Sequence, residues 1–121
     1  MAKEKWFKLI EKEFSQIDQE WQWTYLLLIP ITFNEQTIHK ITITDHWKEK
    51  HSDIINNEKI LELVRKLNGE IMRPEPKKKP NWPEVFVPRG IEHQGRKYRL
   101  IFWFKDHTTN HVWIRNCHPQ D

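Results

Sequence analysis

The clearest hydrophobic pattern of the chain lies in residues 85–118, where three apolar segments are separated by turn-forming residues. The middle segment, Lys97–Phe104, is dense in aromatic and β-branched side chains, which favour a largely buried β-strand. Gln94-Gly95 precedes it and Asp106–Asn110 follows it, and both are typical turn sequences. This region therefore predicts a strand bounded by two short turns.

The segments on either side of this strand have the same character. We expect strands at Glu84–Ile91, which Pro88 and Gly90 interrupt, and at His111–Cys117. Consecutive strands joined by short turns pair in the antiparallel sense. The sequence thus predicts a three-stranded antiparallel meander at its C-terminal end.

The N-terminal segment has a different spacing, which predicts an amphipathic helix over Lys3–Glu20. Its apolar residues recur at steps of three and four, and Lys and Glu fill the positions between them. These apolar residues are Phe7, Ile10, Phe14, Ile17 and Trp21. We expect this helix to pack on the sheet.

Two further strands are predicted next. Trp23–Ile31 is a continuous apolar run, which indicates a buried strand. Gln36–Thr44 is rich in β-branched residues and indicates a second strand, and the turn residues Asn34-Glu35 favour a hairpin between the two.

Helical segments and an irregular loop separate these strands from the meander. We expect a short helical turn at Asp45–His51 and a longer helix at Glu58–Leu67, capped by Asn57. The segment Arg73–Pro83 holds four prolines and a run of three lysines, which predicts an exposed loop. The expected fold is therefore a single α+β domain over residues 1–121, with one sheet packed by helices.

Composition limits the classes of function. The protein has 121 residues, 37% hydrophobic and 31% charged, with a net charge of +3 and an excess of positive charge in its C-terminal half. Such an asymmetry is typical of a surface that binds a polyanion. The single cysteine, Cys117, excludes an intrachain disulfide. With no apolar leader after Met1 and no apolar run near 20 residues, we expect a cytoplasmic protein that does not enter membranes.

Histidine and cationic residues are the candidates for chemistry. Metal-free cleavage of RNA needs one group to take the 2′-OH proton, one to protonate the leaving oxygen, and cations to bind phosphate. Histidine transfers protons well near neutral pH, and arginine matches phosphate geometry. The proton-handling candidates are His46, His51 and His118, and the candidate RNA-binding residues are Lys77, Lys78, Lys79, Arg96, Lys97, Arg99 and Arg115.

Each of these residues also has an ordinary alternative. A histidine in a small basic domain is more often a surface residue than a catalyst, and a lysine run is commonly just solvated. Zinc ligation by His107, His111, Cys117 and His118 is the competing use of the same side chains. Cys117 lies six residues beyond His111 on a strand, about 20 Å away at ~3.3 Å per residue, so one ion cannot reach all of them. We therefore expect no metal and no other cofactor.

The sequence Arg-Lys-Tyr-Arg-Leu-Ile-Phe-Trp-Phe-Lys-Asp at residues 96–106, followed by a turn and His-Val-Trp-Ile-Arg-Asn-Cys-His at 111–118, resembles the end of RelE/ParE-type toxins. The resemblance covers about 35 of the 121 residues. In that family helices come first and a basic sheet face receives RNA. The resemblance implies a ribonuclease-like toxin whose partners are RNA and a cognate antitoxin protein. Unlike those shorter toxins, this chain places two apolar strands before its second helix.

The abundance of tryptophan supports a second hypothesis, a non-catalytic protein-interaction module. The chain has seven Trp, and large aromatic side chains are frequent anchors of protein interfaces. The candidate contact residues for such a surface are Trp21, Trp23, Trp47, Trp82, Trp103 and Trp113.

Overall fold

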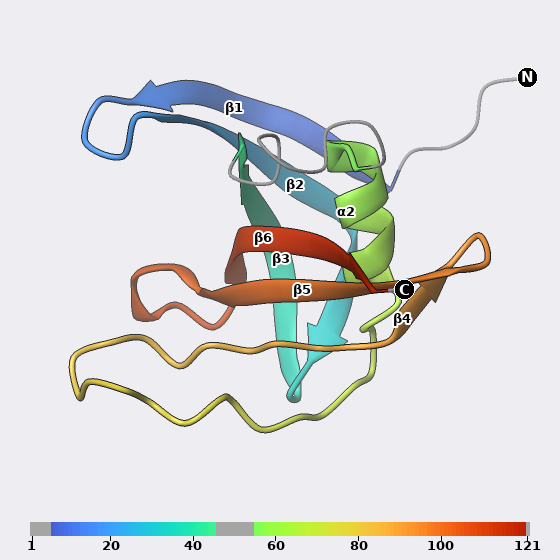
Figure 1. Cartoon of the computed structure of the whole chain (residues 1–121). Coiled ribbons are helices and arrows are strands. Elements are labelled where there is room, and N and C mark those ends of the chain that lie inside the picture. Colours follow the sequence, from blue (N-terminus) through green and yellow to red (C-terminus); the bar gives the residue numbers. More distant parts are fainter. Residues whose placement is uncertain (1–5, 46–54, 121) are drawn as a thin grey trace, which may run out of the picture.

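The computed structural model describes residues 6–45 and 55–120, which form one six-stranded sheet and a single α-helix packed on it (Figure 1). The elements in chain order are β1 (Phe7–Ser15), β2 (Glu20–Phe33), β3 (Gln36–Thr44), α2 (Asn57–Arg65), β4 (Ile91–His93), β5 (Arg96–Phe104), the 3-10 turn η2 (Lys105–His107) and β6 (His111–Gln120). None of the described helices is long and apolar enough to cross a membrane.

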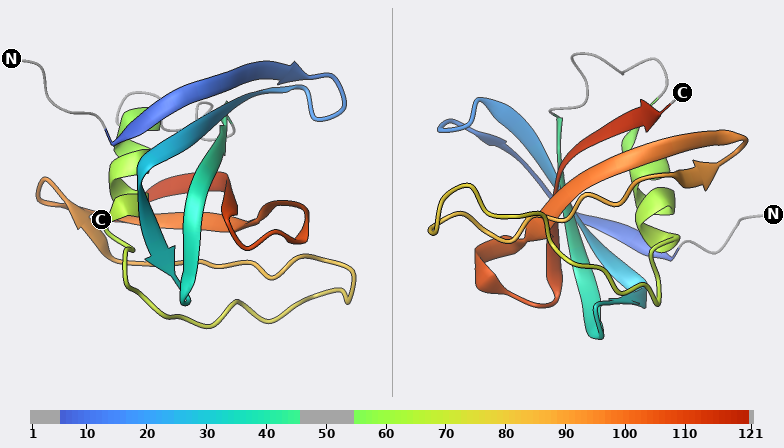
Figure 2. Two further views of the ribbon diagram at one scale, coloured as in Figure 1. Left: turned by 180° about the vertical axis from the view of Figure 1, so that it is seen from behind. Right: turned by 60° about the horizontal axis from the view of Figure 1, so that its bottom comes forward.

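The sheet consists of two antiparallel meanders joined side by side. Its strand order is β1-β2-β3-β6-β5-β4. All neighbouring strands pair antiparallel except β3 and β6, which run parallel from Lys40 opposite His111 to Ile43 opposite Ile114. The twist of the sheet turns β5 and β6 across the direction of β3, as both views of Figure 2 show.

The expected α+β fold with several helices is wrong, because the protein is mostly β. The predicted N-terminal helix over Lys3–Glu20 is replaced by β1 and the first residue of β2. These two strands form a hairpin that pairs Phe7 with Leu27 at one end and Ser15 with Glu20 at the other.

A β-bulge explains why the spacing of apolar residues resembled a helix. The pairing of β1 with β2 shifts by one residue between Leu9 and Glu11, so Ile10 is the extra residue. Side chains alternate between the two faces of a strand, and an extra residue reverses that alternation. Phe7 and Phe14 therefore share a face although they are seven residues apart, the same separation that two helical turns would give.

Most of the other described elements lie where the sequence predicts them. The strands expected at 23–31 and 36–44 are β2 and β3, and they form the expected hairpin. The expected helix at 58–67 is α2, but its N-cap is Asn56 and not the expected Asn57, since the Asn56 side chain accepts a 2.8 Å hydrogen bond from the backbone N–H of Lys59. The C-terminal meander is β4, β5 and β6, but its first strand is Ile91–His93 and not the expected 84–91, in which Phe86 forms an isolated bridge to Phe102. The predicted helical turn at 45–51 lies almost entirely outside the described residues.

Helix α2 packs on one face of the sheet, which we call the helix face. We call the opposite face the open face. On the helix face, Asn57 donates a hydrogen bond to the Tyr25 hydroxyl and the Trp6 indole donates to Glu62. Residues that point to this face form the core together with α2, and they include Ile41, Ile43, Leu100, Phe102, Val112 and Ile114. Burial of these large apolar side chains stabilises the fold at roughly 1.5–3 kcal/mol each.

The open face is polar at its centre. Thr42 of β3 pairs with Thr24 of β2 and with Trp113 of β6, so all three point away from α2. Thr42 is only 1% exposed, and its buried hydroxyl has a hydrogen-bond partner in the Thr24 hydroxyl, 2.8 Å away. On one side of this centre the open face carries the carboxylates of β1, and on the other side it carries the cations of β5.

Candidate functional site

A groove of about 610 Å³ lies on the open face, between β5 and the loop that precedes β4. The loop is closed at its base by a 2.7 Å hydrogen bond from the Glu75 N–H to the Val85 carbonyl. Beyond this point the chain runs along the free side of β5, where Phe86 and Phe102 exchange two backbone hydrogen bonds of 2.8 and 3.0 Å. The backbone on both sides of the groove is therefore held by the sheet.

Strand alternation determines which side chains form the floor of the groove. Phe86 points to the helix face, where its ring packs against Phe33 at 5.3 Å and Phe102 at 5.6 Å between ring centroids. The neighbouring Val85 and Val87 consequently point to the open face, where they line the groove with Ile101 of β5. The floor is therefore apolar.

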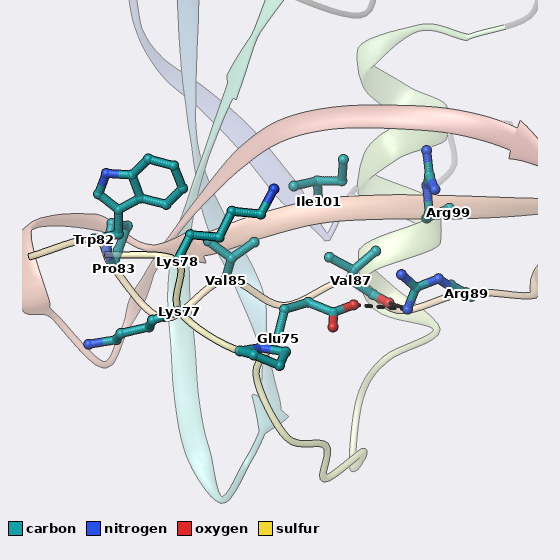
Figure 3. Close-up of a pocket in the computed structure, with 11 residues that line it drawn as sticks. Glu75, Lys77, Lys78, Trp82, Pro83, Val85, Val87, Arg89, Arg99 and Ile101 are labelled. Atoms are coloured by element: carbon teal, nitrogen blue, oxygen red, sulfur yellow. Dashed lines mark hydrogen bonds and ion pairs between the residues drawn. The ribbon is translucent and has the colours of Figure 1, made fainter. Parts of the chain in front are cut away.

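Cationic side chains surround this floor, as Figure 3 shows. The groove is lined by Lys77, Lys78, Arg89 and Arg99, and the carboxylate among its lining residues is Glu75. Arg89 forms a 3.0 Å ion pair with Glu75, which leaves the two lysines and Arg99 in excess. The groove thus has a positive rim over an apolar floor.

Arg99 is the most enclosed of these cations. Its Nε is buried, and no hydrogen-bond partner for this atom is found among the described residues. A buried guanidinium N–H without an acceptor costs free energy unless a ligand or solvent supplies one. Figure 3 shows the Arg99 side chain rising from β5 beyond Ile101. Because Arg99 lines the groove, an anion bound at this end would meet its guanidinium group.

Trp82 stands at the other end of the groove and is 43% exposed. Its ring receives the Lys79 ammonium at 5.5 Å from the ring centroid. Lys77, Trp82 and Pro83 also line a second hollow of about 420 Å³, which extends toward Phe104 and Thr108. Trp82 therefore borders two adjoining hollows.

His118 of β6 is the cross-strand partner of Arg99, so both residues belong to the open face. Two residues along, Lys97 pairs with Gln120 on the same face. The structure therefore brings three of the predicted residues into the groove, Lys77, Lys78 and Arg99, and it places Lys97 and His118 beside Arg99 on the open face.

The remaining predicted residues lie elsewhere. Arg96 alternates with Lys97 and lies on the opposite face of β5, and Lys79 is above Trp82 without lining the groove. Arg115 forms a 3.4 Å ion pair with Glu20, which is nearly buried, in a separate cleft of about 520 Å³ bordered by Trp103 and Trp113. His46, His51 and Trp47 lie outside the described residues.

Sequence reasoning missed Arg89 as a groove residue. The signal was available in the alternation of Val85, Val87 and Arg89, which are two residues apart and so share a face of an extended segment. Pro88 and Gly90 indicate an interrupted strand, and this hides the alternation that continues from Val85 to Arg89.

Two of the described titratable side chains have pKa values far from their usual range. Burial is the main cause that lowers the pKa of His111 to about 4, so this imidazole is neutral at physiological pH. Burial likewise raises the pKa of the Cys117 thiol to about 12, which keeps it protonated and unreactive. Within the described ranges no cluster of three or more His, Cys, Asp or Glu side chains has the geometry of a metal site.

Comparisons of the chain with protein families, with curated proteins and with solved structures find no match.

Proposed function

We propose that the groove binds single-stranded RNA. The observation that carries this proposal is the combination of Lys77, Lys78 and Arg99 around an apolar floor that ends at an exposed tryptophan. Lysine and arginine bind the phosphate backbone, and bases stack on aromatic rings. The phosphate and the base of a nucleotide therefore each have a matching surface in the same groove.

The shape of the site favours a single strand over a duplex. The groove volume of about 610 Å³ is in the range of sites that enclose small molecules, roughly 300–1,000 Å³. Bases in a duplex are paired and stacked, so they cannot reach a recessed apolar floor, whereas those in a single strand can. The two hollows that meet at Trp82 would receive successive nucleotides of such a strand.

Cleavage of the bound strand is a further part of this proposal, and it rests on His118. This residue lies opposite Arg99, so a phosphate held by the guanidinium would be near the imidazole. Cleavage needs a second group to complete the proton transfer. His46 and His51 remain the proposed candidates for that role, and a cognate antitoxin protein remains the proposed partner.

The test is a titration of the purified protein into fluorescently labelled single-stranded RNA, followed by anisotropy at graded salt concentrations. A duplex of the same length serves as the competitor. We expect preferential binding of the single strand, with an affinity that falls steeply as salt rises because bound phosphates release counterions. Absence of binding at low salt would refute the proposal. Incubation of the same RNA followed by gel analysis tests cleavage separately.

A further inference from the structure

The edge strand β1 has properties that the groove does not explain. It pairs with β2 on one side, and within the described part of the chain no strand pairs with its other side. Its residues from Lys8 to Phe14 are all exposed. Long exposed edge strands readily pair with another chain, and proteins usually protect them with prolines or clustered charge.

The bulge at Ile10 gives β1 an unusual distribution of side chains. Before the bulge, Phe7 and Leu9 point to the helix face and Lys8 to the open face, as their partners in β2 show. After the bulge the alternation is reversed. Lys12 and Phe14 therefore point to the helix face, and Glu11 and Glu13 point to the open face.

This reversal makes the strand complementary to itself. In one antiparallel register, Phe7 of one copy lies opposite Phe14 of a second copy, Lys8 lies opposite Glu13, and Leu9 lies opposite Lys12. Residues opposite each other in a sheet must point to the same face. Each of these pairs meets that requirement only because the bulge lies between its members.

The pairing of the two phenylalanines distinguishes this register from its neighbours. The register joins Lys8 to Glu13 twice, once on each side of the two-fold axis, and it places the two phenylalanines together. A shift by two residues in one direction keeps a charge pair, Lys8 opposite Glu11, but places Phe7 opposite Lys12. A shift in the other direction leaves Lys8 opposite Ser15. Because β1 contains two lysines and two glutamates, it has no net charge that would repel a second copy.

The surface around β1 carries enough exposed apolar side chains to favour its burial against another chain. Ile17 in the hairpin turn is 95% exposed, and Phe14 and Trp21 form an exposed edge-to-face pair with centroids 5.4 Å apart. Contiguous apolar side chains on a surface commonly mark a site of association. The exposed large apolar residues of the β1–β2 hairpin are Leu9, Ile10, Phe14, Ile17, Trp21, Leu28 and Ile29.

We propose that the protein forms a symmetric homodimer through antiparallel pairing of β1 with β1 of a second copy. The two sheets then continue into one another across the two-fold axis. The interface of such a dimer is isologous, so each contact occurs twice. The proposal is independent of RNA binding, since the groove lies at the opposite edge of the sheet.

The test is a charge swap followed by sedimentation equilibrium over a range of protein concentrations. Lys8→Glu and Glu13→Lys each place two like-charged pairs across the interface, and we expect either one to raise the dimer dissociation constant roughly tenfold to a hundredfold. The double variant Lys8→Glu/Glu13→Lys restores two opposite-charge pairs, and we expect it to dimerise like the parent. Circular dichroism checks that each variant folds.

A second measurement fixes the register without depending on charge. In the variant Lys8→Cys/Glu13→Cys, the proposed pairing places the new thiols of the two copies opposite each other, so oxidation should join them into a covalent dimer. Lys8→Cys/Lys12→Cys is the matched control, because its thiols are not opposite in this register. A monomeric parent, a dimer that survives both single charge changes, or equal cross-linking in the control would each overturn the proposal.

Discussion

Thr42 of β3 and His111 of β6 are joined by a 2.7 Å hydrogen bond between Oγ1 and Nε2, at the parallel junction of the two meanders. The Thr42 hydroxyl also bonds to that of Thr24, so three strands are connected by one short polar chain on the open face. His111 takes part in this bond as a neutral ring. Burial lowers its pKa to about 4, with a further contribution from Lys105 and Lys40 that exceeds the opposite effect of Asp106.

This arrangement predicts that the protein loses stability in mild acid. The folded-state pKa of His111 lies below its ordinary value of 6.5, so the unfolded chain takes up the proton first as pH falls. The free energy of unfolding should therefore be unaffected by His111 above about pH 6.5 and should decrease between about pH 6.5 and pH 4. The maximum loss is about 3 kcal/mol at ~1.4 kcal/mol per pH unit, and solvent contact should reduce it to roughly 1–2 kcal/mol.

Urea unfolding at several pH values measures this loss. The matched variant is His111→Gln, which keeps a polar side chain near Thr42 and does not titrate. Its unfolding free energy should depend less on pH in this window than that of the parent. An equal dependence in both proteins would assign the acid sensitivity to other groups.

Arg99 and Lys78 should both contribute to RNA affinity. Removal of either cation should weaken binding across RNA sequences and reduce the slope of log affinity against log salt by about 0.7 for each phosphate that the variant no longer neutralises. Anisotropy titrations of Arg99→Gln and Lys78→Ala measure both quantities. Lys40→Ala is the control, because Lys40 is an exposed cation on the open face outside the groove. If this control weakens binding as much as Lys78→Ala does, general charge rather than the groove is responsible.

Trp82 should provide a stacking surface for a base. Its truncation to alanine should weaken binding of single-stranded RNA by roughly 1–3 kcal/mol, the usual contribution of a stacked base, whereas Trp82→Phe should retain most of the affinity. Quenching of tryptophan fluorescence on RNA addition gives an independent readout. Because Trp82 is exposed, neither change should alter the unfolding temperature much; equal RNA affinity of Trp82→Ala and the parent would contradict the stacking role.

The Cys117 thiol should be unreactive in the folded protein. Its side chain is fully buried and burial raises its pKa to about 12, so almost no thiolate exists near neutral pH. A chromogenic thiol reagent should react only after denaturant is added. Cys117→Ser should lower the unfolding free energy by about 1–3 kcal/mol, because it buries a hydroxyl, and Cys117→Ala serves as the comparison. Rapid labelling of the native protein would show that the strand opens locally.

Local sequence determined much of the fold, and its failures have specific physical causes. The β-branched residues of 36–44 and the aromatic run of 97–104 favour strands whatever surrounds them, and both segments are strands in the structure. The N-terminal strand was mistaken for a helix because one extra residue at Ile10 reverses the alternation that identifies a strand. The N-terminal segment is a strand because it forms hydrogen bonds with β2, and the local sequence pattern does not reveal this pairing.

The positions of the site residues could be predicted where the alternation of a strand determines them. They could not be predicted where contacts between distant segments determine them. Lys97 and Arg99 lie on one face of β5 and Arg96 on the other, as the two-residue alternation of a strand requires. The ion pair of Arg115 with Glu20 depends on how the β1–β2 hairpin meets β6, which spans most of the chain. The position of loop 75–85 over β5 likewise follows from the packing of Phe86, so the convergence of its lysines with Arg99 required the structure.

The single parallel junction between β3 and β6 has a consequence for the order of folding. Each meander is built from neighbouring segments, whereas the junction connects residues such as Thr44 and Arg115, which are 71 positions apart in the chain. Closing so long a loop costs entropy before any interaction at the junction forms, and proteins rich in such distant pairings fold slowly. We therefore expect the two meanders to form early and their union to limit the folding rate, so that Ile43→Val and Ile114→Val slow refolding measured by stopped-flow fluorescence. Until that union, both halves present an unpaired inner edge, and the unjoined halves are the state most exposed to misassociation.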